Sequence, residues 1–309
     1  MGGYSRRGLR PAEVVVLITV LAVLGAILVP AILALRESAR RTRCAGNIQQ
    51  LVLALRSYHD AQGCLPVNGL VAWSGTSWMI GILPHLGEHS LYRTIEIHQS
   101  PRHPANIATA MTVVPAFLCP SDGDSDGVME NRSDTGSAAG DPRAVTNYKA
   151  VAGANWAWGD HRVSQPTGRF PNDMHGYCHG NGIICSNSYA GRPCAGGVLT
   201  TRLADISDGL SSTFAIGETV PAWTKWSWWF NSNACTSTCA IPLNYRRGKV
   251  DLREGKDDWG RNSGFFSHHP SGGNFGFCDG MVRFIRDDID MAVYRGLATI
   301  SGGEPVEPP

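Results

Sequence analysis

The chain has 309 residues, with 27 lysines and arginines against 26 aspartates and glutamates, and 17% of its residues are charged, compared with about 25% in average soluble domains. A net charge of +1 gives no electrostatic reason to expect nucleic-acid binding. The composition also excludes a disordered chain, a coiled-coil rod and collagen, whereas 36 glycines and 18 prolines favour a turn-rich body with β structure.

The first predicted element is a membrane helix. Residues 14–35 contain no charged side chain, and a helix needs about 20 apolar residues to cross a bilayer. One alternative is a buried core helix of a soluble protein, but such helices usually have a polar face, and this run has none. Another is a cleaved secretory signal, whose apolar region is usually about 7–15 residues long. The run is longer than that, and charged residues follow it directly, so we expect a retained single-pass anchor.

The charges around this span do not decide its orientation, because arginines flank it on both sides. The chain has nine cysteines, which is more typical of a protein in an oxidising compartment. We therefore expect the body of the chain to lie outside the cytoplasm.

Beyond the span, apolar residues recur at the spacing of an amphipathic helix that ends at Gly63. Residues 13–62 would then form one helix of about 75 Å, with its first half in lipid and its second half packed against a globular head. The apolar stripe of the second half consists of Ile48, Leu51, Val52, Leu55 and Tyr58.

Glu13 lies at the edge of the apolar run, where a carboxylate costs roughly 2–4 kcal/mol unless it is paired or lies at the interface. It lies either among lipid headgroups or beside a cation supplied by another chain. The residues before it, Arg6-Arg7-Gly8-Leu9-Arg10-Pro11-Ala12, together with the apolar run that follows, resemble the processing site of type IV prepilins and pseudopilins.

This resemblance implies that a prepilin peptidase cuts after Gly8 and methylates Leu9, the new first residue. Glu13 would become the fifth residue and would pair with the terminal amine of a neighbouring subunit, and Pro30 would bend the helix. Leu9 stands where the family usually has phenylalanine, and Arg-Pro-Ala follows it where Thr-Leu-Ile or a similar sequence is usual. The implied location is the bacterial inner membrane, with the head in the periplasm or outside the cell.

The predicted fold class is α+β: a pilin-like long N-terminal helix, membrane-spanning in its first half, packed on a β-rich globular head. We divide the chain into a leader (1–8), the long helix (9–62), the head (63–301) and a flexible tail (302–309). Within the head we expect strands at 213–218, 274–278 and 281–285, short helices at 90–96 and 104–113, and irregular stretches at 121–143 and 161–197.

The most specific motif of the head is His269 followed, after nine intervening residues, by Asp279-Gly280. An Asp-Gly pair between two β-prone runs predicts a hairpin with a two-residue type I′ turn. Treating His269 and Asp279 as a hydrolytic pair would need a nucleophile, and none stands out in the sequence. A structural role is therefore the favoured interpretation.

A two-residue turn would set the register of this hairpin. It would pair Phe277 with Val282 and Phe275 with Phe284 on one face, and that apolar face would pack under the head.

The same motif resembles the C-terminal signature of a large bacterial family of prepilin-type proteins that carry a domain of unknown function, DUF1559. The head of that family has no established enzymatic activity, so the resemblance implies an architecture and a location but no catalytic residue, and we expect a protein that is not an enzyme. Further stretches similar to the family occur in order at 40–66, 117–122, 146–153, 208–218 and 297–306.

Asp122, Asp124 and Asp126 alternate as oxygen ligands do at the start of a calcium loop. An EF-hand loop needs a glutamate at its twelfth position, where this chain has Ser133. The alternatives are a solvated acidic loop, which we favour, and a site for calcium or another hard cation; we expect no other cofactor.

The cysteines allow either disulfides or a zinc site. Zinc clusters usually contain two close Cys pairs, and only Cys235 and Cys239 form such a pair. We therefore expect disulfides and no metal, with Cys235 bonded to Cys239 and one further bond within 178–194. Cys44, on the long helix near the membrane, could stay free, since an odd number of cysteines leaves at least one unpaired or paired between chains.

Four tryptophans, Trp223, Trp226, Trp228 and Trp229, lie within seven residues. Exposed, the last three would form a surface for sugar rings or a partner protein. Burial against the long helix is the alternative that we favour.

Two functional hypotheses follow. The first is a pilin-like structural protein, a subunit or accessory of a type IV pilus-like or type II secretion filament, with the membrane, prepilin peptidase and other pilin-like subunits as partners and no nucleic acid. The second is a membrane-tethered binding module for glycan, peptide or calcium. The sequence contains none of the common hydrolase motifs.

Overall fold

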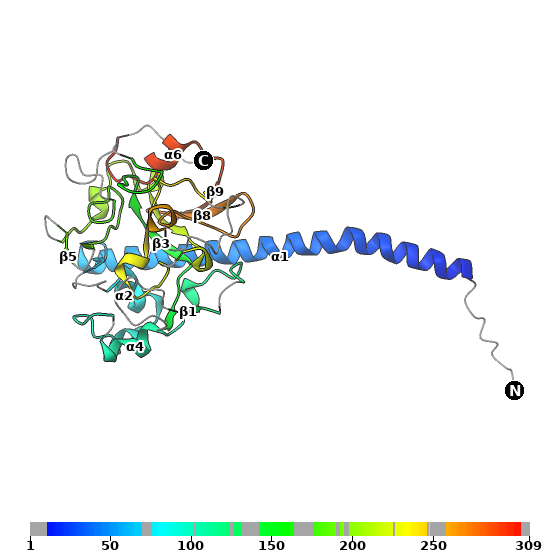
Figure 1. The fold of residues 1–309 in the computed structure, drawn as a ribbon, viewed down its shortest axis with the longest axis horizontal. Coiled ribbons are helices and arrows are strands. Elements are labelled where there is room, and N and C mark those ends of the chain that lie inside the picture. The colour runs from blue at the N-terminus through cyan, green and yellow to red at the C-terminus, as the bar shows by residue number, and fades with distance from the viewer. Residues whose placement is uncertain are drawn as a thin grey trace.

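The computed structural model shows a long helix that carries a globular head near its C-terminal end (Figure 1). The predicted leader, with Gly8 and Leu9, and most of the predicted tail lie outside the residues that the structure describes. These are 11–69, 76–101, 103–123, 126–130, 142–163, 176–189, 192–194, 198–224, 226–245, 247 and 258–303.

The long helix, α1 (Pro11–Gln62), has 52 residues and ends directly before Gly63, as predicted. Its first half projects from the head as a gently curved rod that contains Pro30 (Figure 1). By length and composition this is the one helix of the described residues that fits a membrane span, and its most apolar stretch is not buried by the head. The apolar side chains from Val14 to Leu35 are accordingly exposed.

The head is built around a five-stranded sheet, which confirms the α+β class. In the order of the sheet, the strands are β7 (Thr236–Thr238), β3 (Tyr148–Gly153), β6 (Phe214–Glu218), β8 (Gly272–Phe277) and β9 (Val282–Arg286). The β7–β3 pair is parallel and the other pairs are antiparallel. Two small antiparallel pairs are formed by β1 (Val128–Glu130) with β2 (Pro142–Ala144) and by β4 (Ser188–Tyr189) with β5 (Arg192–Pro193).

Short helices surround this sheet and α1. Their bounds are α2 (Trp78–Ile82), η1 (Leu83–Leu86), α3 (His89–Arg93), α4 (Pro104–Ala110), η2 (Pro115–Phe117), η3 (Leu203–Asp205), η4 (Leu210–Ser212), η5 (Pro221–Trp223), η6 (Ser232–Ala234), α5 (Trp259–Asn262) and α6 (Met291–Gly296). The helices predicted at 90–96 and 104–113 correspond to α3 and α4, and the three predicted strands correspond to β6, β8 and β9.

The two faces of the sheet contribute to separate hydrophobic cores. On one face, Ile216 packs with the apolar stripe of α1, and α2 and η1 pack against α1 as well. On the other face, Phe275 and Phe277 pack with Tyr294 of α6. Side chains alternate between faces along a strand, so the sheet forms a partition between α1 and α6.

The β8–β9 hairpin forms where it was predicted, but the predicted register is wrong by one residue. Gly276, not Phe277, pairs with Val282. The loop has three residues instead of two, because the amide of Phe277 donates to the carbonyl of Met281 at 2.8 Å and that of Gly280 donates to Phe277 at 2.9 Å. Gly280 has a φ of +98°, as in the three-residue loop that combines a type I turn with a left-handed residue.

Candidate functional site

The head holds α1 by the apolar stripe of its second half. Strand β8 crosses this stripe at Gly276, where a Cβ atom would lie 2.6 Å from a methyl of Ile48 and 2.7 Å from a methyl of Val52. Only glycine allows this close approach of strand and helix. The buried residues of the stripe are Cys44, Ile48, Leu51, Val52, Ala54 and Leu55.

The two ends of the segment His269–Gly280 bind α1 at two points. At one end, Nδ1 of His269 lies 2.6 Å from Oε1 of Glu37. At the other end, Arg56 donates to the carbonyl of Asp279 at 2.6 Å. Nineteen helical steps from Glu37 to Arg56 span about 28 Å, and ten extended steps span at most about 33 Å. The ten steps from His269 to Asp279 are therefore long enough to reach from Glu37 to Arg56 along α1.

His269 lies at the centre of a polar cluster at the point where α1 leaves the head. Its side chain is fully buried, with Nδ1 against Glu37 and Nε2 3.3 Å from Oε1 of Glu218. A neutral imidazole can donate from only one nitrogen, so two facing carboxylates favour the protonated ring. Burial acts to lower the pKa of His269, but the hydrogen bonds and negative charges of Glu218 and Glu37 outweigh it and hold the pKa above its ordinary value.

Glu37 joins this cluster to the surface of α1. Arg40, one turn further along the helix, donates to its Oε2 at 2.6 and 2.9 Å, and the hydroxyl of Ser121 lies 3.4 Å from both carboxylate oxygens. Burial acts to raise the pKa of Glu37, but the hydrogen bonds from His269 and Arg40 prevail and hold the pKa below its ordinary value.

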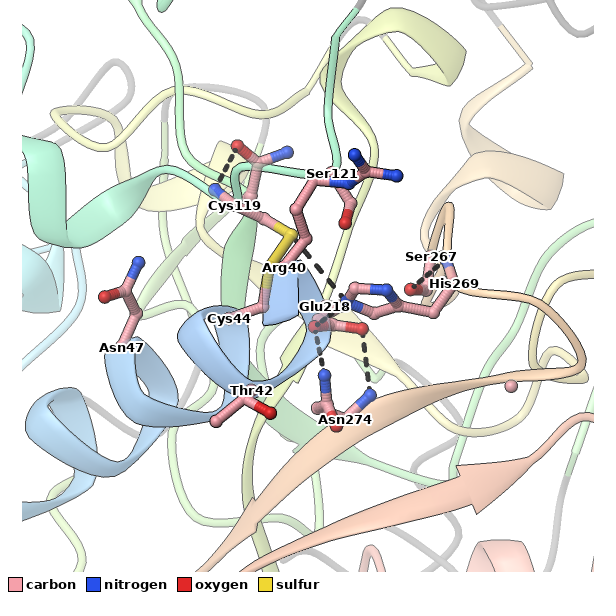
Figure 2. Close-up of polar contacts among 12 residues, drawn as sticks. Arg40, Thr42, Cys44, Asn47, Cys119, Ser121, Glu218, Ser267, His269 and Asn274 are labelled. Carbon is pink, nitrogen blue, oxygen red and sulfur yellow. Dashed lines mark hydrogen bonds and ion pairs between the residues drawn. A yellow bond between two sulfur atoms is a disulfide. The ribbon is translucent and has the colours of Figure 1, made fainter. Parts of the chain in front are cut away.

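Glu218, the last residue of β6, is held rigidly on the side of the sheet. The amide of Asn274 donates to its Oε2 and the side-chain amide of Asn274 donates to its Oε1, both at 2.8 Å (Figure 2). The carboxylate is buried, and its remaining edge faces His269.

A disulfide between Cys44 of α1 and Cys119 completes the cluster (Figure 2). Sγ of Cys119 lies 3.9 Å from Nε2 of His269. The potential ligand atoms of Cys44, Cys119, Glu218 and His269 all lie within 4.8 Å of one another, and all four residues are buried. The cluster thus combines a covalent bond, an ion-pair chain and four side chains of the types that bind metals.

The structure corrects two predictions about the cysteines and confirms a third. Cys44 is bonded to Cys119, whereas the sequence had suggested it as a candidate for a free thiol. Cys235 and Cys239 are not bonded to each other and remain buried thiols. Strand β7 lies between them, and four extended steps place their Cα atoms about 13 Å apart, which is too far for a disulfide. The bond expected within 178–194 forms between Cys178 and Cys194.

The described members of the acidic run face different partners. Oδ2 of Asp122 accepts from Asn147 at 2.6 Å, and Oδ1 lies 3.4 Å from Nε2 of His268. Oδ1 of Asp126 accepts from the amide of Val128 at 3.1 Å. Asp124 lies outside the described residues. Asp122 and Asp126 therefore act in local hydrogen bonding of the turn and of its contact with the head.

The tryptophans are buried in the head, as the favoured interpretation predicted, and do not form the exposed surface that was the alternative. Trp226, Trp228 and Trp229 are at most 8% exposed. Trp229 lies against Phe117 and donates to the carbonyl of Thr112 at 2.9 Å. Because these rings fill the head, they offer no surface on which sugar rings could stack, and the glycan-binding form of the second hypothesis loses its basis.

The residues of the pilin-like resemblance lie away from this cluster. Glu13 is exposed in the first turn of α1, and Pro30 lies inside the exposed half of that helix. The structure therefore brings His269 and the turn at Asp279-Gly280 together with α1, but not with Glu13.

Sequence reasoning missed Glu37, Glu218 and the Cys44–Cys119 bond. Glu37 had one available signal, since it is the only acidic residue among the arginines that follow the span. Glu218 ends a stretch already similar to the family, and its role could have been sought there. Neither signal predicts that both carboxylates face one histidine.

A comparison with family models matches residues 34–292 to the family SBP_bac_10, described as a protein of unknown function (DUF1559). The match begins at the end of the apolar run and ends in α6, so it includes the docked half of α1 and nearly all of the head. No curated protein and no solved structure matches the chain.

Proposed function

The chain belongs to this DUF1559 family, and we propose that it is a pilin-like structural protein of the bacterial inner membrane. Its first helix anchors it, its head lies in the periplasm or outside the cell, and its partners are prepilin peptidase and other pilin-like subunits. It serves as a subunit or accessory of a type IV pilus-like or type II secretion filament.

The exposed first half of α1 is the observation that carries this proposal. Its apolar side chains between Val14 and Leu35 are exposed all around the helix, and apolar surface in water is unfavourable by about 25 cal/mol for each Å². Lipid or other apolar helices must therefore cover it. The rod is continuous with the segment docked in the head, as a subunit needs if its head is to follow its anchor into a filament.

Two further observations support this proposal. The disulfides Cys44–Cys119 and Cys178–Cys194 are typical of proteins in oxidising compartments, which supports an exported head. Glu13 lies in the first turn of the rod, where burial between apolar helices would require a cationic partner. In the proposed assembly, that partner is the terminal amine of the neighbouring subunit after cleavage at Gly8.

Intact mass and N-terminal sequencing of the protein from its native membrane test the processing step. We expect a chain that begins at Leu9 and carries one added methyl group. A chain that retains residues 1–8 would contradict processing by prepilin peptidase.

Substitution of Glu13 tests subunit pairing. With two differently tagged copies in one cell, Glu13→Gln should reduce co-purification and crosslinking at least several-fold, because the neutral amide no longer attracts the neighbouring amine. Glu96→Gln, an exposed position of the head, is the matched control and should pair as the wild type does. Equal pairing of both variants, with both heads folded, would contradict the role of Glu13.

A further inference from the structure

The arrangement around His269 resembles a metal site in its second layer of contacts as well as in its ligands. Histidines that bind metals almost always donate their other ring N–H to a carboxylate or carbonyl group, which fixes the ring and raises its basicity. In this cluster, Nδ1 of His269 is hydrogen-bonded to Glu37 at 2.6 Å. Nε2, the nitrogen left for a ligand bond, faces Glu218 and the sulfur of Cys119.

The other ligand side chains are held just as firmly. Both oxygens of Glu218 accept from Asn274, and the amide of Cys119 donates to Asn147 at 3.0 Å. Cys44 lies on α1, whose position is set by the packing of its stripe. Protein metal sites rely on such support, because ligands that are already in place lose little freedom when the ion binds.

We propose that, when the Cys44–Cys119 disulfide is reduced, Cys44, Cys119, Glu218 and His269 bind one zinc-like divalent ion, with Glu37 as the residue that positions His269. The disulfide and the bound ion exclude each other, because both use the sulfur atoms of Cys44 and Cys119. A dithiol reductant first gives two thiols and is itself oxidised to a disulfide. The ion then binds two thiolates, releasing the thiol protons and any proton on Nε2.

The distances fit a tetrahedral ion. With metal–sulfur bonds of about 2.3 Å and metal–nitrogen or metal–oxygen bonds of about 2.0–2.2 Å, neighbouring ligand atoms lie about 3.3–3.8 Å apart. Nε2 of His269 lies 3.3 Å from Glu218 and 3.9 Å from Cys119, so these atoms are already spaced as needed. The two sulfurs must move apart, which the loss of their bond permits.

The ligand types and the charges favour zinc among divalent ions. Two thiolates and an imidazole bind zinc in preference to the hard cations magnesium and calcium, which take oxygen ligands. The ion would carry two positive charges against two thiolates and the Glu218 carboxylate, while Arg40 balances Glu37 through its ion pair. The bound site therefore has a small net charge, as a buried cluster requires.

Cobalt titration of the full chain in detergent tests the proposal. The protein is reduced without oxygen, freed of metal and titrated with Co²⁺. The reduced wild type should bind one Co²⁺ for each chain, with the visible bands of tetrahedral cobalt and a sulfur-to-cobalt charge-transfer band, and Zn²⁺ should displace it. The oxidised wild type should show neither band.

Matched variants locate the ion. The double variant Cys44→Ser, Cys119→Ser should lose the charge-transfer band, whereas Cys178→Ser, Cys194→Ser, which removes the other disulfide, should keep it. Glu37→Gln should keep the spectrum but bind about 10–100-fold more weakly, because only the support of His269 changes. Circular dichroism of each variant shows whether its head is folded.

X-ray absorption of the zinc-loaded, reduced wild type gives a test that needs no variant. It should show two sulfur ligands at about 2.3 Å and two nitrogen or oxygen ligands at about 2.0–2.2 Å. Three or four sulfur ligands, no Co²⁺ binding by the reduced protein, or the same bands in the folded Cys44→Ser, Cys119→Ser variant would overturn the proposal. Since none of these measurements depends on assembly, the proposed function stands or falls separately.

Discussion

The two halves of α1 belong to one uninterrupted helix, yet they meet different surroundings. Between Val14 and Leu35 the side chains are apolar all around the axis and exposed. Between Cys44 and Leu55 a buried stripe faces the head, and Leu53, on another side, is 49% exposed. A helix that is apolar all round needs an apolar environment on every side, whereas a striped helix needs a partner on one side only.

The boundary between the two halves of α1 carries charged side chains that contact the head. Glu37 and Arg40 lie in the short charged segment after the apolar run, and Glu37 reaches His269 in the head. Charged groups are absent from residues 14–35, and a charge placed in the buried stripe would lose its hydration without gaining a partner. The junction is the part of the helix where a carboxylate can both remain charged and contact the head.

The same substitution in each half provides the largest expected contrast. Val52→Asp places a carboxylate in the apolar core and should destabilise the head by about 4 kcal/mol or more. Val23→Asp should leave the thermal unfolding of the head unchanged but weaken membrane insertion by about 2.5–3.5 kcal/mol. Thermal unfolding and membrane fractionation measure the two effects, and a folded, stable Val52→Asp head would show that the stripe is not held by apolar packing.

The apolar interior of the head contains a fully buried lysine, whose titration reports how strongly that interior disfavours a charge. Lys149 is 1% exposed in β3, and burial lowers its pKa from 10.5 to about 7. The folded state therefore binds the proton more weakly than the unfolded state, so its stability rises with pH between about 7 and 10.5. Lys149→Met should stabilise the head by about 4 kcal/mol near pH 7, because the charge is lost and each pKa unit corresponds to about 1.36 kcal/mol.

Denaturant unfolding at several pH values measures this effect. The advantage of Lys149→Met over the wild type should shrink as the pH approaches 10, because the wild-type lysine is then neutral in the folded state and loses its charge in the unfolded state too. A difference that stays constant with pH would show that Lys149 remains charged in the fold.

Substitutions of two glycines should have smaller and opposite effects. Gly276→Ala puts a methyl group against Ile48 and Val52 and should destabilise the docking of α1 by about 2 kcal/mol. Gly46→Ala lies in the docked half of α1, where the added carbon meets no described atom within 4 Å apart from the adjoining helix backbone, and it should stabilise the helix by about 0.5–1 kcal/mol. Limited proteolysis and thermal unfolding measure both variants; equal effects would mean that β8 does not set the approach of α1.

Much of the fold was predictable because it rests on local patterns. The apolar run and the stripe have helical periodicity, so the length of α1 and its end before Gly63 follow from neighbouring residues. The pattern around Asp279-Gly280 predicts a hairpin for the same reason. The loop length does not follow from the local pattern, because Asp-Gly also suits a three-residue loop in which only glycine has a positive φ. The observed register is the one that places Gly276 against α1.

The sequence alone determined an apolar anchor, an amphipathic continuation and a β-rich head, since each depends on residues close together in the chain. The cluster of Glu37, Cys44, Cys119, Glu218 and His269 could not be derived in this way, because its members come from distant parts of the chain. No spacing rule relates them. They meet because α1 docks along β8 and β6, and that docking depends on the shape and packing of the whole head.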